Sequence, residues 1–172
     1  MVPTSFVNAV SAATTADAVW AALEALTAER IGAKLFTVMT VDMAAGLARR
    51  TYSNHPVDYP VSGTKPIHRD AWFDIVHGER RSFIANTIDD IAKVFPDHPL
   101  IKSLGCESVM NLPVVLGNDL VATINMLDVA GHYTPERVAR AEARADHQDE
   151  GDRDSEWPAK IFTGNRSGFG VG

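Results

Sequence analysis

The chain has 172 residues, of which 45% are hydrophobic and 22% are charged, and its formal net charge is −6. These values predict one globular domain that is long enough to bury a core, and the negative charge argues against nucleic acid or an anionic membrane as a partner. No basic residue precedes Arg30 and no apolar run approaches about 18 residues, so we expect neither a secretory signal nor a membrane helix, and we predict a cytoplasmic protein.

A helix is the first element that the sequence predicts. Residues 1–13 are weakly patterned, and we expect them to form a frayed lead-in. From Thr14 onward, apolar residues recur at the spacing of one helical face. Thr14 and Asp17 have the spacing of a capping box, and Gly32 is placed to end the helix.

Two strands and a loop are predicted next. Residues 33–41 are rich in β-branched and aromatic side chains, and residues 47–53 follow after a short turn. Arg49 and Arg50 indicate that the second of these strands lies at an exposed edge. Residues 54–66 contain three prolines and a glycine, which predict a long loop.

The middle of the chain alternates short elements. We predict a helix over residues 69–77 and a third strand over residues 81–86. Two helical pieces, residues 89–95 and 98–104, follow, and a proline separates them.

A hairpin of two apolar strands, residues 107–116 and 120–128, is the central feature of the sequence, and a three-residue loop joins the strands. This loop length gives one wholly apolar face and one face that carries polar groups, whereas a two-residue turn would mix them. We therefore expect a ligand on the polar-bearing face. The predicted pairs on that face are Val109–Leu127, Asn111–Asn125, Pro113–Thr123 and Val115–Val121, and those on the apolar face are Met110–Met126, Leu112–Ile124, Val114–Ala122 and Leu116–Leu120.

A last helix and a tail complete the chain. Thr134 and Pro135 indicate a helix cap and a first helical position. After Val138 only alanines interrupt an acidic stretch, which cannot bury enough apolar surface to order itself. We place the domain at residues 10–145 and expect residues 146–172, acidic and then glycine-rich, to be disordered.

The order of these elements and several of their residues resemble the GAF domain family. The resemblance implies an α+β fold with a GAF/PAS-like antiparallel sheet in the strand order 2-1-5-4-3. It implies that the first and last helices cover one face and that a ligand pocket lies under loops on the other. The matching residues are His98-Pro99 before Leu104-Gly105, Ser108 at the head of a strand, Pro113 within that strand, the turn at Gly117, Asn125 in the next strand, and Tyr133-Thr134-Pro135-Glu136 at the start of the final helix.

Three activities of the GAF family can be compared with this sequence. Members that bind cyclic nucleotides carry an Asp-Glu pair, which is missing from residues 133–137. Members that bind bilins use a cysteine flanked by histidine, whereas Cys106 stands beside Glu107. Members that reduce free methionine sulfoxide use several cysteines, and this chain has one. We therefore expect no cofactor and no catalytic residue, and because the six histidines do not have a metal-ligand spacing such as His-Glu-x-x-His, we expect no metal site.

Seven residues are candidates for ligand contact, either by stacking or by orienting polar groups. For Trp72 and Phe73 the alternative is an ordinary core position. For Asn111 and Asn125 the alternative is a hydrogen bond to each other or to a loop backbone. The candidates are Trp72, Phe73, Phe83, Asn86, Asn111, Thr123 and Asn125.

The function that we predict is a sensory or regulatory module that binds a small metabolite of unknown identity. One alternative is a dimerisation or interaction scaffold with a closed pocket. Another is a redox enzyme with Cys106 as its nucleophile, although we interpret Cys106 as an inert buried thiol. We expect a homodimer through the first and last helices and no nucleic-acid or membrane partner.

Overall fold

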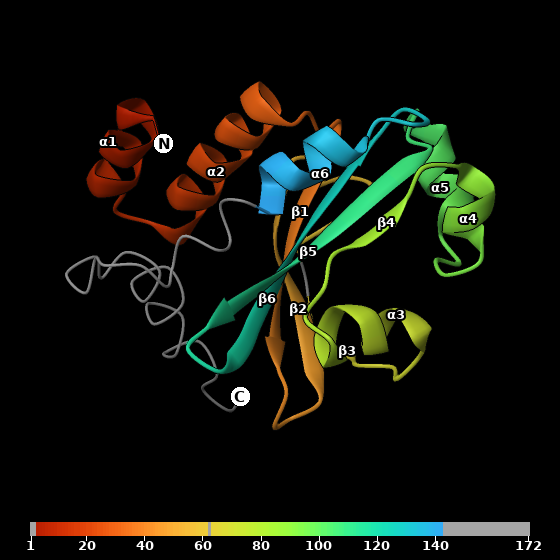
Figure 1. Cartoon of the computed structure of the whole chain (residues 1–172). Helices are drawn as coiled ribbons and strands as arrows, with labels where there is room; N and C mark the ends of the chain where they lie inside the picture. The colour runs from red at the N-terminus through yellow and green to blue at the C-terminus, as the bar shows by residue number, and fades with distance from the viewer. Residues whose placement is uncertain (1–2, 62, 143–172) are drawn as a thin grey trace.

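The computed structural model describes residues 3–61 and 63–142. Over these residues the chain forms a six-stranded antiparallel sheet in the order β3-β2-β1-β6-β5-β4, with helices packed on it (Figure 1). The predicted antiparallel α+β fold is therefore confirmed. The elements in chain order are α1 (Thr4–Ala12), α2 (Ala16–Arg30), β1 (Leu35–Asp42), β2 (Leu47–Ser53), β3 (Lys65–Pro66), α3 (Ala71–Phe73), the π-helical segment η1 (Asp74–Gly78), β4 (Phe83–Ala85), α4 (Ile88–Ala92), α5 (His98–Ser103), β5 (Ser108–Leu116), β6 (Asp119–Asp128) and α6 (Pro135–Glu142).

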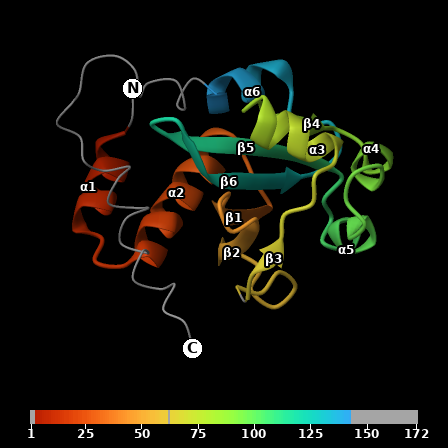
Figure 2. The same ribbon diagram turned by 90° about the horizontal axis from the view of Figure 1, so that it is seen from below.

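The sheet separates two groups of helices. Helices α1 and α2 lie on one side of it, and α4 and α5 lie on the other, in both Figure 1 and Figure 2. The core between the sheet and helices α2 and α6 is apolar and includes the buried side chains of Trp20, Phe36, Met110, Met126 and Tyr133. Met110 and Met126 belong to the predicted apolar face of the hairpin, so that face is the one that α2 and α6 cover.

A second core lies on the opposite face of the sheet. It joins Leu35, Val109 and Leu127 of the strands to Ile91 of α4 and Ile101 of α5. Side chains alternate between the two faces along a strand. Val109 and Met110 are consecutive residues of β5, and they belong to different cores. This alternation leaves Asn111, the next residue, on the side of α4 and α5.

The N-terminal residues form helix α1, whereas we expected a frayed lead-in. A helix of nine residues is marginal in isolation. Helix α1 packs against α2, and Phe6 is buried, so tertiary packing that local patterning does not reveal accounts for the error. Helix α2 is capped by Thr15 and not by the predicted Thr14, because the Thr15 hydroxyl oxygen accepts a hydrogen bond from the Ala18 N–H at 3.2 Å. Gly32 ends the helix as predicted, at a φ of 90°.

The hairpin of β5 and β6 has the predicted register over most of its length. The pairs from Val109–Leu127 to Val114–Ala122 are confirmed. Beyond them a β-bulge shifts the register, so that Val115 pairs with Leu120, and Leu116 pairs with Asp119. The predicted three-residue loop and its last two pairs are therefore wrong. The bulge absorbs one residue, which lets a two-residue turn close the hairpin without mixing the two faces.

The edge of the sheet at β2 and the helical segment in the middle of the chain also differ from the prediction. Residues 65 and 66, expected in a loop, form β3, which pairs with Leu47 and Ala48, so the start of β2 is not an exposed edge. The helix predicted over residues 69–77 is the short helix α3 followed by η1. The carboxylate of Asp70 caps α3 by accepting a hydrogen bond from the Phe73 N–H at 2.8 Å.

The last described element, α6, begins at Pro135 as predicted, and the Thr134 hydroxyl oxygen accepts a hydrogen bond from the Arg137 N–H at 3.4 Å. The predicted domain end at residue 145 and the expected disorder of residues 146–172 lie outside the described residues. In residues 3–61 and 63–142, no helix is long and apolar enough to cross a membrane.

Candidate functional site

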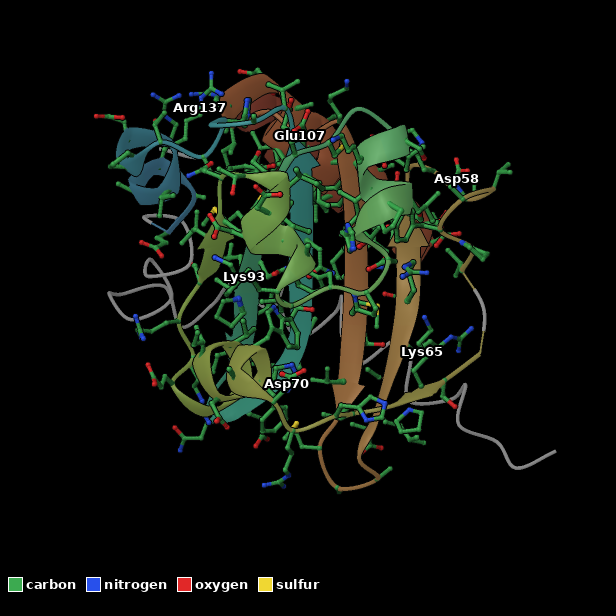
Figure 3. All side chains as sticks on the ribbon, turned by 90° about the vertical axis from the view of Figure 1, so that its right-hand side faces the viewer. Asp58, Lys65, Asp70, Lys93, Glu107 and Arg137 are labelled. Carbon is green, nitrogen blue, oxygen red and sulfur yellow. The ribbon has the colours of Figure 1, made fainter. Side chains whose placement is uncertain are left out.

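A cavity of about 330 Å³ lies on the face of the sheet that α2 and α6 do not cover. Strands β1, β2, β5 and β6 all contribute lining residues, and the loop after β2, the segment from β3 to η1 and residues of the segment from Phe95 to Ile101 complete the lining. Figure 3 looks onto this face: Asp70 and Lys65 lie toward one end of the strands, and Asp58 lies toward the other. The polar and aromatic lining residues are Thr37, Arg50, Tyr59, Lys65, His68, Asp70, Trp72, His77, Phe95, Asp97, Asn111, Thr123 and Asn125.

A chain of hydrogen bonds crosses the floor of the cavity. The Trp72 indole N–H donates to Asn111 Oδ1 at 2.9 Å, and Asn111 Nδ2 donates to Asn125 Oδ1 at 2.7 Å. Asn125 Nδ2 in turn donates to the Thr37 hydroxyl oxygen at 3.2 Å. The register explains this arrangement, because Asn125 pairs with Asn111 on one side and with Thr37 on the other. The two amides are therefore bonded to each other, which is one of the alternatives that the sequence left open.

The seven predicted contact residues do not all meet at the cavity. Trp72, Asn111, Thr123 and Asn125 line it together. The other three candidates, Phe73, Phe83 and Asn86, are not among its lining residues.

Each of these three residues has a structural partner instead. The Phe73 ring lies 4.7 Å from the His77 ring, and the Phe83 ring lies 6.0 Å from the Phe95 ring, measured between centroids. Asn86 bonds the backbone of the segment that leads into α6. Its Oδ1 accepts a hydrogen bond from the N–H of Tyr133 and its Nδ2 donates one to the carbonyl of the same residue, both at 3.0 Å.

Several cavity residues were missed by sequence reasoning, and Arg50 is the most informative of them. Arg49 and Arg50 were interpreted together as marks of an exposed edge. Strand alternation separates them: Arg49 is exposed, and Arg50 lines the cavity. The Arg50 guanidinium carbon lies 4.9 Å from the centre of the Tyr59 ring, and its Nη1 donates to the Pro60 carbonyl at 3.2 Å. The Tyr59 hydroxyl donates to Asp97 Oδ2 at 2.8 Å.

Burial changes the titration of the groups around the cavity. It lowers the pKa of His77 below its ordinary value of 6.5, so the imidazole is neutral at neutral pH. Burial also lowers the pKa of Arg50, but a guanidinium stays protonated in proteins. Burial and the hydrogen bond to Asp97 raise the pKa of Tyr59. Of these three groups, Arg50 is a permanent cation, His77 is a neutral imidazole and Tyr59 is a neutral phenol, and the exposed residue Lys65 also lines the cavity.

Cys106 is not among the lining residues of the cavity, although it packs in one cluster with some of them, and it is completely buried. Burial raises the pKa of its thiol, which lowers the fraction of reactive thiolate. The interpretation of Cys106 as a buried thiol is confirmed by its zero exposure. Among the described residues, no group of three His, Cys, Asp or Glu side chains is arranged to hold a metal ion.

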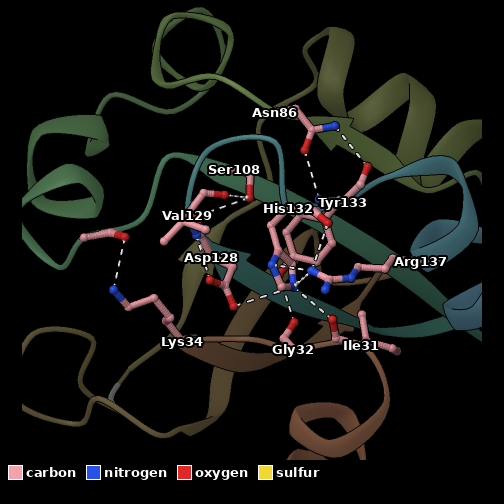
Figure 4. Close-up of polar contacts among 11 residues, drawn as sticks. Ile31, Gly32, Lys34, Asn86, Ser108, Asp128, Val129, His132, Tyr133 and Arg137 are labelled. Carbon is pink, nitrogen blue, oxygen red and sulfur yellow. Dashed lines mark hydrogen bonds and ion pairs between the residues drawn. The ribbon is translucent and has the colours of Figure 1, made fainter.

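A second polar cluster, shown in Figure 4, ties the helices to the end of the sheet. His132 Nε2 lies 2.9 Å from the Ile31 carbonyl oxygen and 3.6 Å from Asp128 Oδ2, and Arg137 Nη1 lies 2.6 Å from His132 Nδ1. The Ser108 hydroxyl is completely buried and donates to the backbone carbonyl of Val129 at 2.7 Å, with the carbonyl of Asp128 at 3.2 Å. Because Ser108 is committed to the backbone, this serine, histidine and aspartate have a structural arrangement and not that of a nucleophile and its base.

No protein-family model and no curated protein sequence matches the chain. Solved structures do match. The GAF domain of a phosphoenolpyruvate-protein phosphotransferase from Coxiella burnetii is similar with a TM-score of 0.66 and 13% identity, over 98% of this chain and 94% of that one. The GAF domain of a two-component sensor histidine kinase from Bacillus halodurans has a TM-score of 0.62 and 12% identity, over 79% of this chain and 92% of that one.

A third similar structure is an enzyme. Free methionine-R-sulfoxide reductase from Neisseria meningitidis, in complex with its substrate, has a TM-score of 0.60 and 14% identity, over 96% of this chain and 88% of that one. At these identities the similarity concerns the fold alone. The chain has the fold of a GAF domain.

Proposed function

We propose that the chain is a sensory or regulatory module and that a small metabolite binds in the cavity on the β5–β6 face. The observation that carries the proposal is the cavity itself, which has an apolar lining and a few converging polar side chains. Small-molecule sites in proteins have this composition, and about 330 Å³ is at the lower end of their usual volumes. The ligand is therefore a small one.

The regulatory part of the proposal is supported by the similar structures. One of them is a domain of a sensor histidine kinase, and another is a domain of a phosphoenolpyruvate-protein phosphotransferase. We propose a comparable role for this chain, with an output through a separate partner or through a second copy. These names do not identify the ligand, which has to be inferred from the cavity.

Binding without catalysis is the simplest use of this site. The Neisseria meningitidis reductase acts on a small molecule. A thiol reductase that forms an intrachain disulfide needs two cysteines, and this sequence has one. That cysteine is completely buried and its pKa is raised by burial, so it is a poor nucleophile. We therefore propose that the ligand leaves the cavity unchanged.

The sheet provides a route from the cavity to the helices. Asn111 lines the cavity, and its neighbour Met110 packs in the core beneath α2 and α6. A ligand that moves β5 changes the packing of both side chains at once. We propose that α2 and α6 carry the response, through a homodimer formed by these helices.

Native mass spectrometry of the purified protein tests the proposal. We expect the wild-type chain to retain a small molecule that is lost on denaturation. The double variant Asn111→Leu plus Asn125→Leu should lose it, because leucine removes the polar groups of the floor and changes its shape. Asn118→Leu, an exposed asparagine in the β5–β6 turn, is the matched control and should retain it. If the double variant carries the same molecule with unchanged affinity, the ligand does not bind on this face.

A further inference from the structure

Two residues that line the cavity each have a buried nitrogen without a hydrogen-bond partner. Among the buried side-chain nitrogen and oxygen atoms of the described residues, Arg50 Nε and His77 Nδ1 are the two without a partner. Both residues line the same cavity, although one is on β2 and the other is on η1. Buried polar groups in folded proteins are almost always paired. Because both unpaired nitrogens belong to residues that line one cavity, we infer that a bound molecule supplies their hydrogen-bond partners.

The geometry of Arg50 defines what that partner must be. A guanidinium has five N–H donors and no acceptor, so its partner has to be an acceptor. Nη1 is already used by the Pro60 carbonyl. In the described part of the chain, the remaining edge, formed by Nε and Nη2, makes no hydrogen bond. This edge of an arginine binds a carboxylate through two parallel hydrogen bonds.

The charges around Arg50 leave room for one anionic group. Within residues 3–61 and 63–142, no acidic side chain lies within 4.0 Å of the Arg50 nitrogens. The carboxylate of Asp97 influences Arg50 electrostatically, but Asp97 is exposed and already accepts a hydrogen bond from the Tyr59 hydroxyl. Asp70 is occupied as the cap of α3. The exposed residue Lys65 also lines the cavity, so Arg50 is the partly buried cation of the lining. Its guanidinium neutralises one charge, which favours a carboxylate over a doubly charged phosphate.

The remaining lining fits the rest of such a molecule. The cavity wall includes Leu35, Met39, Val109 and Leu127, which offer apolar contacts along the floor. The two asparagines of the floor are hydrogen-bonded to each other and to their neighbours. They therefore shape the cavity and do not require a hydrogen bond from a ligand.

From these observations, and resting on the proposed function, we propose that the cavity binds a small organic monocarboxylate with an apolar body, held by the Nε–Nη2 edge of Arg50. Arg50 is then the residue that selects an anion. The Tyr59 ring and the Pro60 carbonyl hold its guanidinium in position.

Thermal shift and calorimetric titration with matched acid and amide pairs test this proposal. The probes are the straight-chain acids from butanoate to octanoate together with phenylacetate and phenylpropanoate, each compared with its primary amide. We expect several of the acids to raise the melting temperature more than their amides. The best acid should bind the 172-residue chain ~10- to 100-fold more tightly than its amide, as expected for hydrogen bonds to a charged group.

Substitutions of the two adjacent arginines test whether Arg50 is responsible for the preference for acids over amides. Arg50→Gln should reduce each acid to the affinity of its amide. Arg49→Gln removes the same charge from the exposed face of the same strand and should leave the acid preference unchanged. If Arg50→Gln does not fold, Arg50→Lys keeps the charge without the paired N–H edge, and the acid preference should fall in that variant too.

Other outcomes overturn the proposal in distinguishable ways. If acids and amides bind equally well, the cavity binds small molecules without selecting an anion, so the proposed function stands and this inference fails. If the acid preference persists in Arg50→Gln and in Arg50→Lys, the anion binds elsewhere. If no acid in the series binds better than its amide and no small molecule is retained in native mass spectrometry, both the inference and the proposed function fail.

Discussion

Replacing the asparagine pair on the cavity floor tests whether the hydrogen-bond chain across the strands stabilises the fold. Asn111→Leu removes an amide that accepts from the Trp72 indole and donates to Asn125. It leaves the Trp72 N–H and Asn125 Oδ1 without these partners. A buried polar group without a partner costs ~1–3 kcal/mol, and Asn125 and Trp72 are only half-buried, so we expect a loss of ~2 kcal/mol in the free energy of unfolding.

The double variant should cost less than the two single variants together. Asn125→Leu alone leaves Asn111 Nδ2 without its acceptor and the Thr37 hydroxyl without its donor, and we expect a loss of ~1–2 kcal/mol. The double variant has neither side-chain amide, so no donor or acceptor of the Asn111–Asn125 hydrogen bond is left without its partner. The sum of the single effects should therefore exceed the double effect by ~1 kcal/mol.

Urea denaturation followed by circular dichroism measures these differences. Asn118→Leu, in the exposed turn, is the control and should change the free energy of unfolding by less than ~0.5 kcal/mol. If the two single effects add to the double effect within ~0.5 kcal/mol, the bond between the two amides contributes nothing to stability. That result would refute the argument that the floor is held together by its own side chains.

Three further predictions concern single residues. Native Cys106 should react slowly with thiol reagents at neutral pH and rapidly after unfolding, because burial excludes the reagent and raises the pKa of the thiol; equal rates would contradict this. Gly32→Ala should lower the free energy of unfolding by more than ~1 kcal/mol in a urea titration, because φ is 90° and a Cβ would lie 2.5 Å from His132 Nε2; an unchanged midpoint would contradict this. Burial lowers the pKa of His77, so the unfolded chain binds more protons below pH 6.5, and stability should fall as the pH decreases through that value. His77→Gln should flatten this part of the stability profile, and an identical slope in the variant would contradict the assignment.

The register of the hairpin could be predicted because the order of apolar and polar residues along its two strands restricts how they can pair. Keeping one face wholly apolar and both asparagines together on the other favours one register, and the pairs from Val109–Leu127 to Val114–Ala122 follow from it. The same argument could not locate the bulge after Val114. A bulge and a two-residue turn satisfy the facial segregation as well as a three-residue loop does, so side-chain pattern alone does not choose between them.

The candidate site was predicted in part for a similar reason. Trp72, Asn111, Thr123 and Asn125 meet at the cavity because strand register and the short helix α3 place them there. Arg50 was missed because the two adjacent arginines were interpreted together as marks of an edge strand, although consecutive strand residues point to opposite faces of the sheet. The contacts of Tyr59 and Asp97 bring together loops that are 38 residues apart in the chain, and no local pattern contains that information.

The Nε–H group of Arg50 can be observed directly by NMR of the arginine side chains, and its signal can be assigned by its loss in Arg50→Lys. We predict that adding the best-binding acid of the series shifts the Arg50 Nε–H signal and slows its exchange with water, because the carboxylate supplies the acceptor that this nitrogen lacks. The Arg49 signal should stay unchanged. Saturating binding of the acid with an unchanged Arg50 signal would contradict the assignment of the cavity as a carboxylate site.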